Sequence, residues 1–219
     1  MKALCFGSMN IDYVYSLDHI VGPGETIFST GRETFAGGKG LNQSVAMAKA
    51  GLPVWHAGIC GTGGELLIDT LRENGVDTSL VRVRKGQTTG TASIEVNAEG
   101  ENHIIVVPAA NGECDMEWLE DALHALEDCD IFLLQHEIPL DVVHEAIRRL
   151  HAMGKTVILV LHEINYAAFY SDYICAFVDG RVAKFGTVRE VMNKEVLSKI
   201  YNVDFEILEI EGKPLSIYY

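Results

Sequence analysis

Basic residues are missing from a long central part of the sequence. No Lys or Arg occurs between Lys85 and Arg148, whereas 14 of the 31 acidic residues lie there. The chain as a whole carries a net charge of −14. Because nucleic acids and anionic membrane surfaces bind proteins through clustered Lys and Arg, we expect neither as a partner.

Cysteine and long apolar runs are also scarce. The five cysteines are odd in number and scattered, which suits neither a disulfide framework nor a zinc motif and favours a cytoplasmic location. The apolar run after Lys2 stops at Gly7, too early for a signal peptide, and no later run reaches the roughly 18 residues of a membrane span. His144 and His151 lack a further ligand at suitable spacing, so we expect no metal site. These absences predict a soluble protein without membrane insertion.

The remaining composition is that of an ordinary folded protein, with 48% hydrophobic and 22% charged residues in 219. Apolar segments alternate between strand-like and helix-like periods, which predicts an α/β fold with a mostly parallel sheet flanked by helices. The expected strands are residues 2–6, 54–60, 131–135 and 156–161, and the expected helices are 41–50, 65–74, a helix capped by Asp115, and 140–153. A projecting hairpin is expected from 89–97 and 102–108.

Beyond residue 161 this regular order ends. We expect a short helix from Glu163, a hairpin that turns at Asp179 and Gly180, one helix opened by a capping box of Thr187 and Glu190, and two final strands. The carboxyl-terminal part is therefore predicted as a short α/β segment.

Three groups of polar residues are candidates for a binding site. Asn10 and Asp12 follow the first strand, the glycine-rich run 37–43 opens a helix, and Glu137 follows the strand 131–135. Glycines let a ligand approach the backbone at a helix start, and open α/β sheets bind ligands at the carboxyl ends of their strands. The alternatives are a simple turn at Asn10, a flexible glycine loop and a solvated acid at Glu137.

Several motifs, in order, resemble ribokinase and the wider PfkB family of sugar kinases over about residues 1–159. They are Gly7–Asp12, Pro23–Thr26, Gly37–Gln43, Gly75–Ser79, Thr88–Ala92 and Leu133–Glu137. The resemblance implies ATP- and magnesium-dependent phosphorylation of a small sugar. It implies a sugar site formed by Asn10, Asp12, Gly38, Lys39, Asn42 and Glu137. It also implies a β lid, with strands near 13–15, 27–34, 89–96 and 104–107, that pairs two subunits as a homodimer.

The sequence departs from the family pattern in ways that affect catalysis. An acid usual in the family is absent from Gly61–Gly64, and Ala109 stands where glycine is commoner. No Gly-Ala-Gly-Asp run occurs, although in the family this motif holds phosphate charge and supplies the catalytic base. Because phosphoryl transfer depends on such positioning and electrostatics, we expect no intact catalytic set and no useful kinase turnover. ATP and magnesium are expected for the family, and we doubt that this chain binds them.

A second resemblance covers about residues 154–219. Val160–Ala168, Tyr170–Asp172, Asp179–Arg181 and Leu197–Tyr201 resemble the carboxyl-terminal part of an ABC-transporter ATPase, closest to iron-siderophore importers. His162 matches the family's switch histidine, which contacts the γ-phosphate. The phosphate loop, signature motif and Walker B acid are absent, so an inactive strand-end histidine is favoured. Gly154–Thr156 imitates the end of a phosphate loop and is interpreted as a turn.

We therefore predict two parts, a ribokinase-like sugar-binding part with a lid at 1–159 and an ABC-ATPase-like segment at 160–219. Three functional hypotheses remain open. The first is a sugar kinase by descent that at most binds a small sugar. The second is a noncatalytic sugar-binding or dimerising chimera, and the third is a fragmentary ABC-transporter ATP-binding subunit.

Overall fold

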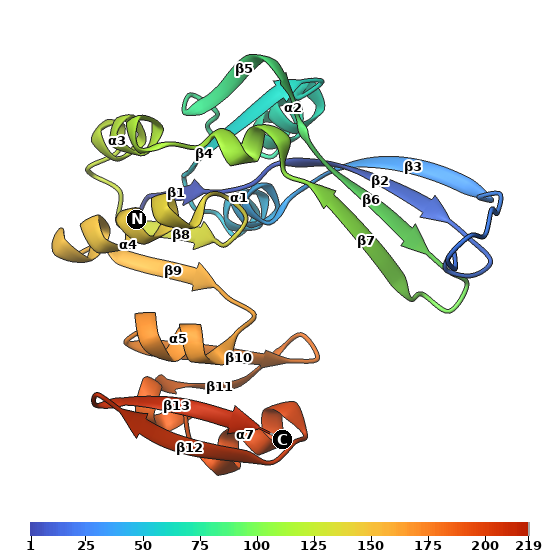
Figure 1. Cartoon of the computed structure of the whole chain (residues 1–219). Coiled ribbons are helices and arrows are strands. Elements are labelled where there is room, and N and C mark those ends of the chain that lie inside the picture. The colour runs from blue at the N-terminus through green and yellow to red at the C-terminus, as the bar shows by residue number, and fades with distance from the viewer. Residues whose placement is uncertain (219) are drawn as a thin grey trace. The chain divides into compact units, whose positions relative to one another are not determined.

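The computed structural model describes residues 1–218, and the chain divides into two compact units. The amino-terminal unit is Met1–Val160 and the carboxyl-terminal unit is Leu161–Tyr219. Figure 1 shows the elements of each unit. Within residues 1–218, no helix is both long and apolar enough to cross a membrane.

A five-stranded parallel sheet forms the centre of the amino-terminal unit, with the order β5-β4-β1-β8-β9. The strands are β1 (Ala3–Phe6), β4 (Val54–Thr62), β5 (Val81–Thr88), β8 (Ile131–Gln135) and β9 (Thr156–Val160). Side chains of β1 alternate between the two faces and are all buried, as expected of a parallel sheet covered on both sides. The predicted α/β class with a mostly parallel sheet is confirmed.

Helices cover both faces of this sheet. The helices are α1 (Lys39–Lys49), α2 (Glu65–Glu73), α3 (Met116–Ala125) and α4 (Leu140–Ala152), with a short 3₁₀ helix, η1 (Ala109–Glu113). On one face Phe6 packs edge-on against Trp118 of α3, with ring centroids 5.6 Å apart. On the other face Leu41 of α1 and Leu67 of α2 belong to a second hydrophobic core. Figure 1 shows α1 on the strands whose ends build the site described below.

A second, four-stranded sheet projects from this unit (Figure 1), with the order β3-β2-β6-β7. Its strands are β2 (Asn10–Ser16), β3 (Gly31–Gly37), β6 (Gly90–Val96) and β7 (Asn102–Val107). We refer to it as the lid sheet. The expected strand at 27–34 was placed too early: pairing begins at Gly31 because its partner, Ser16, is the last residue of β2.

One helix of the amino-terminal unit begins earlier than expected, and one of its strands was not expected. Helix α1 begins at Lys39 rather than at residue 41. Gly38 has a φ of +93°, which is not a helical conformation, so the first helical residue is the next one, Lys39. Strand β5 was not expected. It is an edge strand in which valines alternate with arginines, so its apolar signal is weak.

Over its described residues, 161–218, the carboxyl-terminal unit contains two separate hairpins and three short helices. Its elements are α5 (Ile164–Tyr170), β10 (Tyr173–Val178), β11 (Arg181–Thr187), α6 (Val188–Val191), α7 (Lys194–Tyr201), β12 (Phe205–Ile210) and β13 (Lys213–Tyr218). The turn at Asp179 and Gly180, both with positive φ, and the capping box of Thr187 and Glu190 are confirmed. The single helix expected here is two helices, because the Asn193 side chain accepts from the Val196 amide and starts α7 anew.

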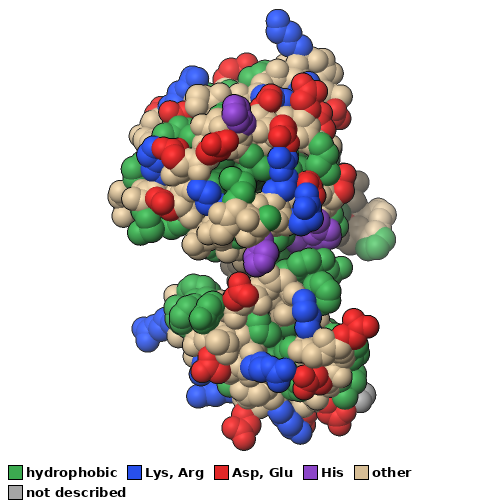
Figure 2. Space-filling model, turned by 90° about the vertical axis from the view of Figure 1, so that its left-hand side faces the viewer, with side chains coloured by type: hydrophobic (Ala, Val, Ile, Leu, Met, Phe, Trp, Pro, Cys, Tyr) green, Lys and Arg blue, Asp and Glu red, His purple; other side chains and the backbone are tan. Residues whose placement is uncertain are grey.

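The surface of the molecule is mixed in character. Figure 2 shows acidic, basic and hydrophobic side chains interspersed over the visible face. Among residues 161–218, six buried hydrophobic residues form the core of the carboxyl-terminal unit. Several large side chains of its first hairpin are accordingly exposed, among them Tyr173, Phe177 and Phe185.

Candidate functional site

The candidate site begins where α1 rests on the chain between β1 and β2. The Leu41 amide donates to the Ser8 carbonyl oxygen at 3.0 Å. A side chain at Gly38 would place its Cβ 2.8 Å from the same oxygen, and a Cβ at Gly40 would lie 2.6 Å from the Gly7 Cα. These contacts require glycine, and they bring the first turn of α1 to the carboxyl end of β1.

Glu137, in the turn after β8, is held at this helix start. Its Oε2 accepts from the Ser8 hydroxyl at 2.5 Å and from the Lys39 amide at 3.2 Å, and its Oε1 pairs with the Lys39 ammonium. Burial opposes ionisation of Glu137, but the hydrogen bonds and charge of Lys39 and the bond from Ser8 prevail and lower its pKa. Glu137 is therefore a carboxylate at neutral pH.

Asp12, on β2, is a second carboxyl group near Glu137. Burial and then the negative charge of Glu137 raise its pKa. Its carboxylate lies against the Gly37 backbone, where an added Cβ would come within 2.0 Å of Oδ2. The site thus joins two acids of opposite pKa shift, a pattern that is common where side chains have a function.

Asn10, at the start of β2, is buried and held by Asn111 of η1. The Asn111 Nδ2 donates to the Asn10 Oδ1 at 2.8 Å and to the Met9 carbonyl oxygen at 3.1 Å, while the Asn111 Oδ1 accepts from the Met9 amide at 2.9 Å. This arrangement fixes the Asn10 amide in one orientation. A Cβ at Gly90 of the neighbouring strand β6 would lie 2.4 Å from the Asn10 Oδ1, so the two lid-sheet strands meet closely at Asn10.

Asn42 and His162 stand apart from this cluster. Asn42 is exposed in the turn of α1 after Gly38, and its amide donates to the Gly38 carbonyl oxygen at 3.0 Å. His162 is exposed before α5 in the carboxyl-terminal unit. Thus Asn10, Asp12, Gly38, Lys39 and Glu137 converge, Asn42 lies one turn away, and His162 belongs to the other unit.

Four further residues shape the site and were not singled out from the sequence: Ser8, Gln43, Asn111 and Gln135. Ser8, Gln43 and Gln135 lie inside the motifs Gly7–Asp12, Gly37–Gln43 and Leu133–Glu137, and this membership was the available signal for them. Asn111 and Gln135 are fully or almost fully buried and act through long-range hydrogen bonds. Outside these motifs, no local pattern distinguishes Asn111 from other buried polar groups.

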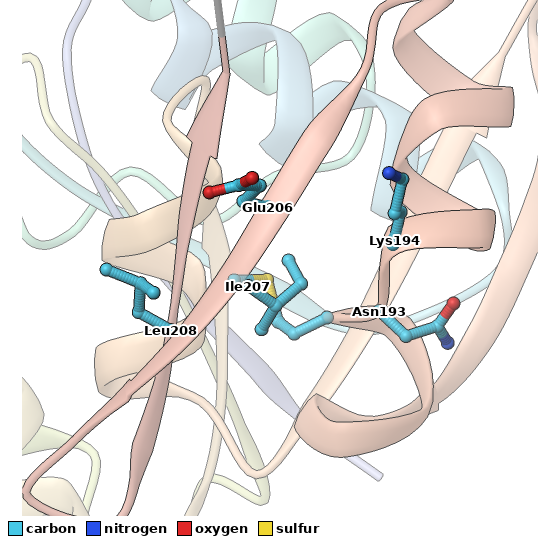
Figure 3. Close-up of a pocket in the computed structure, with 6 residues that line it drawn as sticks. Asn193, Lys194, Glu206, Ile207 and Leu208 are labelled. Atoms are coloured by element: carbon cyan, nitrogen blue, oxygen red, sulfur yellow. The ribbon is translucent and has the colours of Figure 1, made fainter.

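A shallow depression of about 460 Å³ lies elsewhere, in the carboxyl-terminal unit (Figure 3). Asn193 and Lys194 from the start of α7 and the strand β12 line it, together with Met192. Its lining contains one acid, Glu206, and one base, Lys194, beside apolar side chains. We regard the convergent cluster around Glu137 as the candidate site.

The described residues around the site and around the run Gly154–Thr156 bear on metal and nucleotide binding. Within residues 1–218, no group of three His, Cys, Asp or Glu side chains is arranged to hold a metal ion. The Lys155 ammonium, in the run that imitates a phosphate loop, donates to the carbonyl oxygens of Glu127 at 2.6 Å and Cys129 at 3.0 Å. The prediction of a turn there is confirmed, since α4 ends at Ala152 and β9 begins at Thr156.

A parallel α/β sheet with a projecting lid sheet and polar side chains at the strand ends defines the class of the ribokinase-like sugar kinases. The family model for pfkB family carbohydrate kinases matches residues 1–179, past the boundary expected at 159. The ribokinase of Bacillus subtilis is 36% identical over 162 residues, which cover 73% of this chain and 55% of that protein. The chain belongs to the PfkB family of carbohydrate kinases.

Two other comparisons bear on the chain. The structure of Arabidopsis thaliana ribokinase complexed with ribose and ATP has a TM-score of 0.64 and 30% identity, and the match covers 74% of this chain and 54% of that one. The petrobactin import ATP-binding protein FatE of Bacillus anthracis is 44% identical over 71 residues, 32% of this chain and 28% of FatE. The chain spans about half the length of the ribokinases that it matches.

Proposed function

We propose that the amino-terminal unit binds a small sugar. The residues are those of the polar cluster with the neighbouring turn of α1: Asn10, Asp12, Gly38, Lys39, Asn42 and Glu137. The observation that carries the proposal is the convergence of Asp12, Lys39 and Glu137, because two carboxylates and an ammonium at one strand edge can accept from and donate to several sugar hydroxyls. Ribose binding by the Arabidopsis relative supports the same substrate class.

Calorimetric titration with ribose, fructose and nucleosides tests this proposal. We expect one of the sugars to bind, and Glu137→Gln to weaken its binding by about tenfold or more, since hydrogen bonds to a charged group contribute about 1.5–3 kcal/mol. Glu145→Gln is the matched control, because Glu145 lies on α4 and pairs with exposed Arg148. The absence of sugar binding, or equal affinity of the Glu137→Gln variant, would contradict the proposal.

We further propose that this chain alone transfers phosphate much more slowly than the ribokinases it resembles. Support comes from the sequence of this chain, which contains no Gly-Ala-Gly-Asp run. The loss of a catalytic base typically costs about 10² to 10⁴ in rate. Sugar-dependent ADP release from ATP, measured with magnesium and clearly above that of Glu137→Ala, would refute this part.

A second candidate function is dimerisation through the lid sheet. Four consecutive residues of the edge strand β7, Ile104 to Val107, are between 49% and 55% exposed, and Phe35 of the opposite edge strand is 48% exposed. Such an exposed apolar strand suits pairing with a second copy. We expect a dimer in light scattering after size exclusion, a monomer for Ile105→Lys, and an unchanged dimer for Val83→Lys on β5. A monomeric parent chain at all concentrations would exclude this function.

For residues 160–219 we propose common ancestry with siderophore-import ATPases, without nucleotide binding of their own. The identity with FatE supports the ancestry. His162 is the residue to test, because it matches the switch histidine and is exposed. We expect ATP titrations of the whole chain to give the same result for the parent and for His162→Ala. A loss of ATP affinity in this variant would show that the histidine still contacts phosphate.

A further inference from the structure

Two side-chain contacts join helix α1 to the chain at the end of β8. The outer contact is the ion pair of Lys39 and Glu137. The inner contact is a pair of glutamine side chains. Gln135, the last residue of β8, donates from Nε2 to the Oε1 of Gln43 at 2.7 Å. Gln43 lies four residues after Lys39 and so shares its face of the helix, and Gln135 precedes Glu137 by two residues.

The inner contact is deeply buried. Gln135 is fully buried, and its Nε2 also lies 3.5 Å from the Cys5 sulfur, which in turn donates to the Gly40 carbonyl oxygen at 3.4 Å. Burial raises the pKa of the Cys5 thiol to about 11, so it remains a neutral donor. The glutamine pair is thus tied to β1 and to the first turn of α1 together.

Gln135 is unfavourable for the stability of the fold at this buried position. Within residues 1–218 its Oε1 has no hydrogen-bond partner, and a Cβ added at Gly7 would lie 2.1 Å from this oxygen. A buried polar atom without a partner costs about 1–3 kcal/mol, and an apolar residue would avoid that cost. A side chain that is unfavourable for stability but bonded to a helix of the site indicates a role in the site.

We propose that Gln43 and Gln135 are positioning residues that fix α1 against the end of β8 and so hold the Lys39 ammonium on the Glu137 carboxylate. Asp12 and Lys39 are the charged groups that face Glu137, and Ser8 donates to it. A shift of α1 would move Lys39 away from the carboxylate while leaving Asp12 in place on β2. The consequence for sugar affinity rests on the proposed function, whereas the consequence for Glu137 does not.

The test is a carbon-13 NMR titration of the Glu137 carboxyl group in the full chain. We expect the Glu137 pKa to rise in Gln43→Met and in Gln135→Met, because each substitution removes the hydrogen bond between the two side-chain amides at nearly constant side-chain volume. The double variant should show the same rise as either single one, since the pair acts as one contact. Gln87→Met is the control, because Gln87 is an exposed glutamine near Glu113, away from this contact.

A lowered melting temperature with an unchanged Glu137 titration in both single variants would overturn the proposal, because it would show a purely structural role. Gln43 is only partly buried, so Gln43→Met keeps the test valid if Gln135→Met fails to fold. Where the parent chain binds a sugar, each of the two substitutions should lower the affinity for that sugar by roughly tenfold. A parent chain that binds no sugar removes the proposed function alone, and the titration still decides the role of the glutamines.

Discussion

We expect acid to destabilise the amino-terminal unit through His56. This residue lies on β4, is fully buried, and shares a 2.8 Å hydrogen bond between its Nδ1 and the Ser44 hydroxyl of α1. Burial lowers its pKa from 6.5 to about 4. In the folded chain His56 is therefore neutral over a pH range in which the unfolded chain has already protonated it.

The magnitude follows from that difference. Because the folded pKa is lower than the unfolded one, the unfolded state binds more protons, and stability is lost as the pH falls from 6.5 towards 4. At about 1.36 kcal/mol per pKa unit the full loss is roughly 3 kcal/mol, of which about 2 to 3 kcal/mol is reached by pH 4.5. Above pH 6.5 the contribution is constant.

Urea unfolding followed by tryptophan fluorescence measures this loss in the relevant unit. The two tryptophans, Trp55 and Trp118, both belong to the amino-terminal unit. We expect His56→Gln to be less stable than the parent at pH 7, but to lose about 2 to 3 kcal/mol less between pH 7 and 4.5. His151→Gln, an exposed histidine of α4, should behave like the parent. Equal acid losses in the parent and in His56→Gln would refute the reasoning.

Three further outcomes are expected. Gly38→Ala should lower the free energy of unfolding by about 2 kcal/mol or more, because φ is +93° and the new Cβ meets backbone; urea melts measure it, with exposed Gly112→Ala as control. Asn111→Ala should cost about 3 kcal/mol through three lost hydrogen bonds and should also weaken sugar binding; unchanged melts would contradict this. Ellman's reagent should modify Cys175 alone in the native chain, and all five cysteines in urea; rapid native modification of a second thiol would argue against the fold. The four buried cysteines are Cys5, Cys60, Cys114 and Cys129.

Local signals in the sequence predicted local structure well. The Asp115 side chain accepts from the Trp118 amide at 2.8 Å and starts α3 as expected, and the capping box at Thr187 starts α6. Each of these devices joins atoms within four residues of one another, so its partner is visible in the sequence. Where the deciding partner is distant, as for β3 and its pairing with β2, the boundary was misplaced.

The candidate site divides in the same way. The resemblance to the PfkB family marked Asn10, Asp12, Gly38, Lys39, Asn42 and Glu137, and the structure brings five of these six together. It assigned no role to the residues that hold them. Ser8 and Glu137 are 129 residues apart, Asn10 and Asn111 are 101 apart, and Gln43 and Gln135 are 92 apart. No periodicity relates such positions.

By itself, then, the sequence determined the α/β class, the family motifs and the chemical types of the side chains at the strand ends, because these depend on period and short-range spacing. Only the tertiary structure decided which acid is held ionised, which is held towards its neutral form, and which amides fix the helix beside them. Those properties depend on burial and on distances between segments far apart in the chain. They exist only once the parallel sheet has brought β1, β8 and α1 to the same edge.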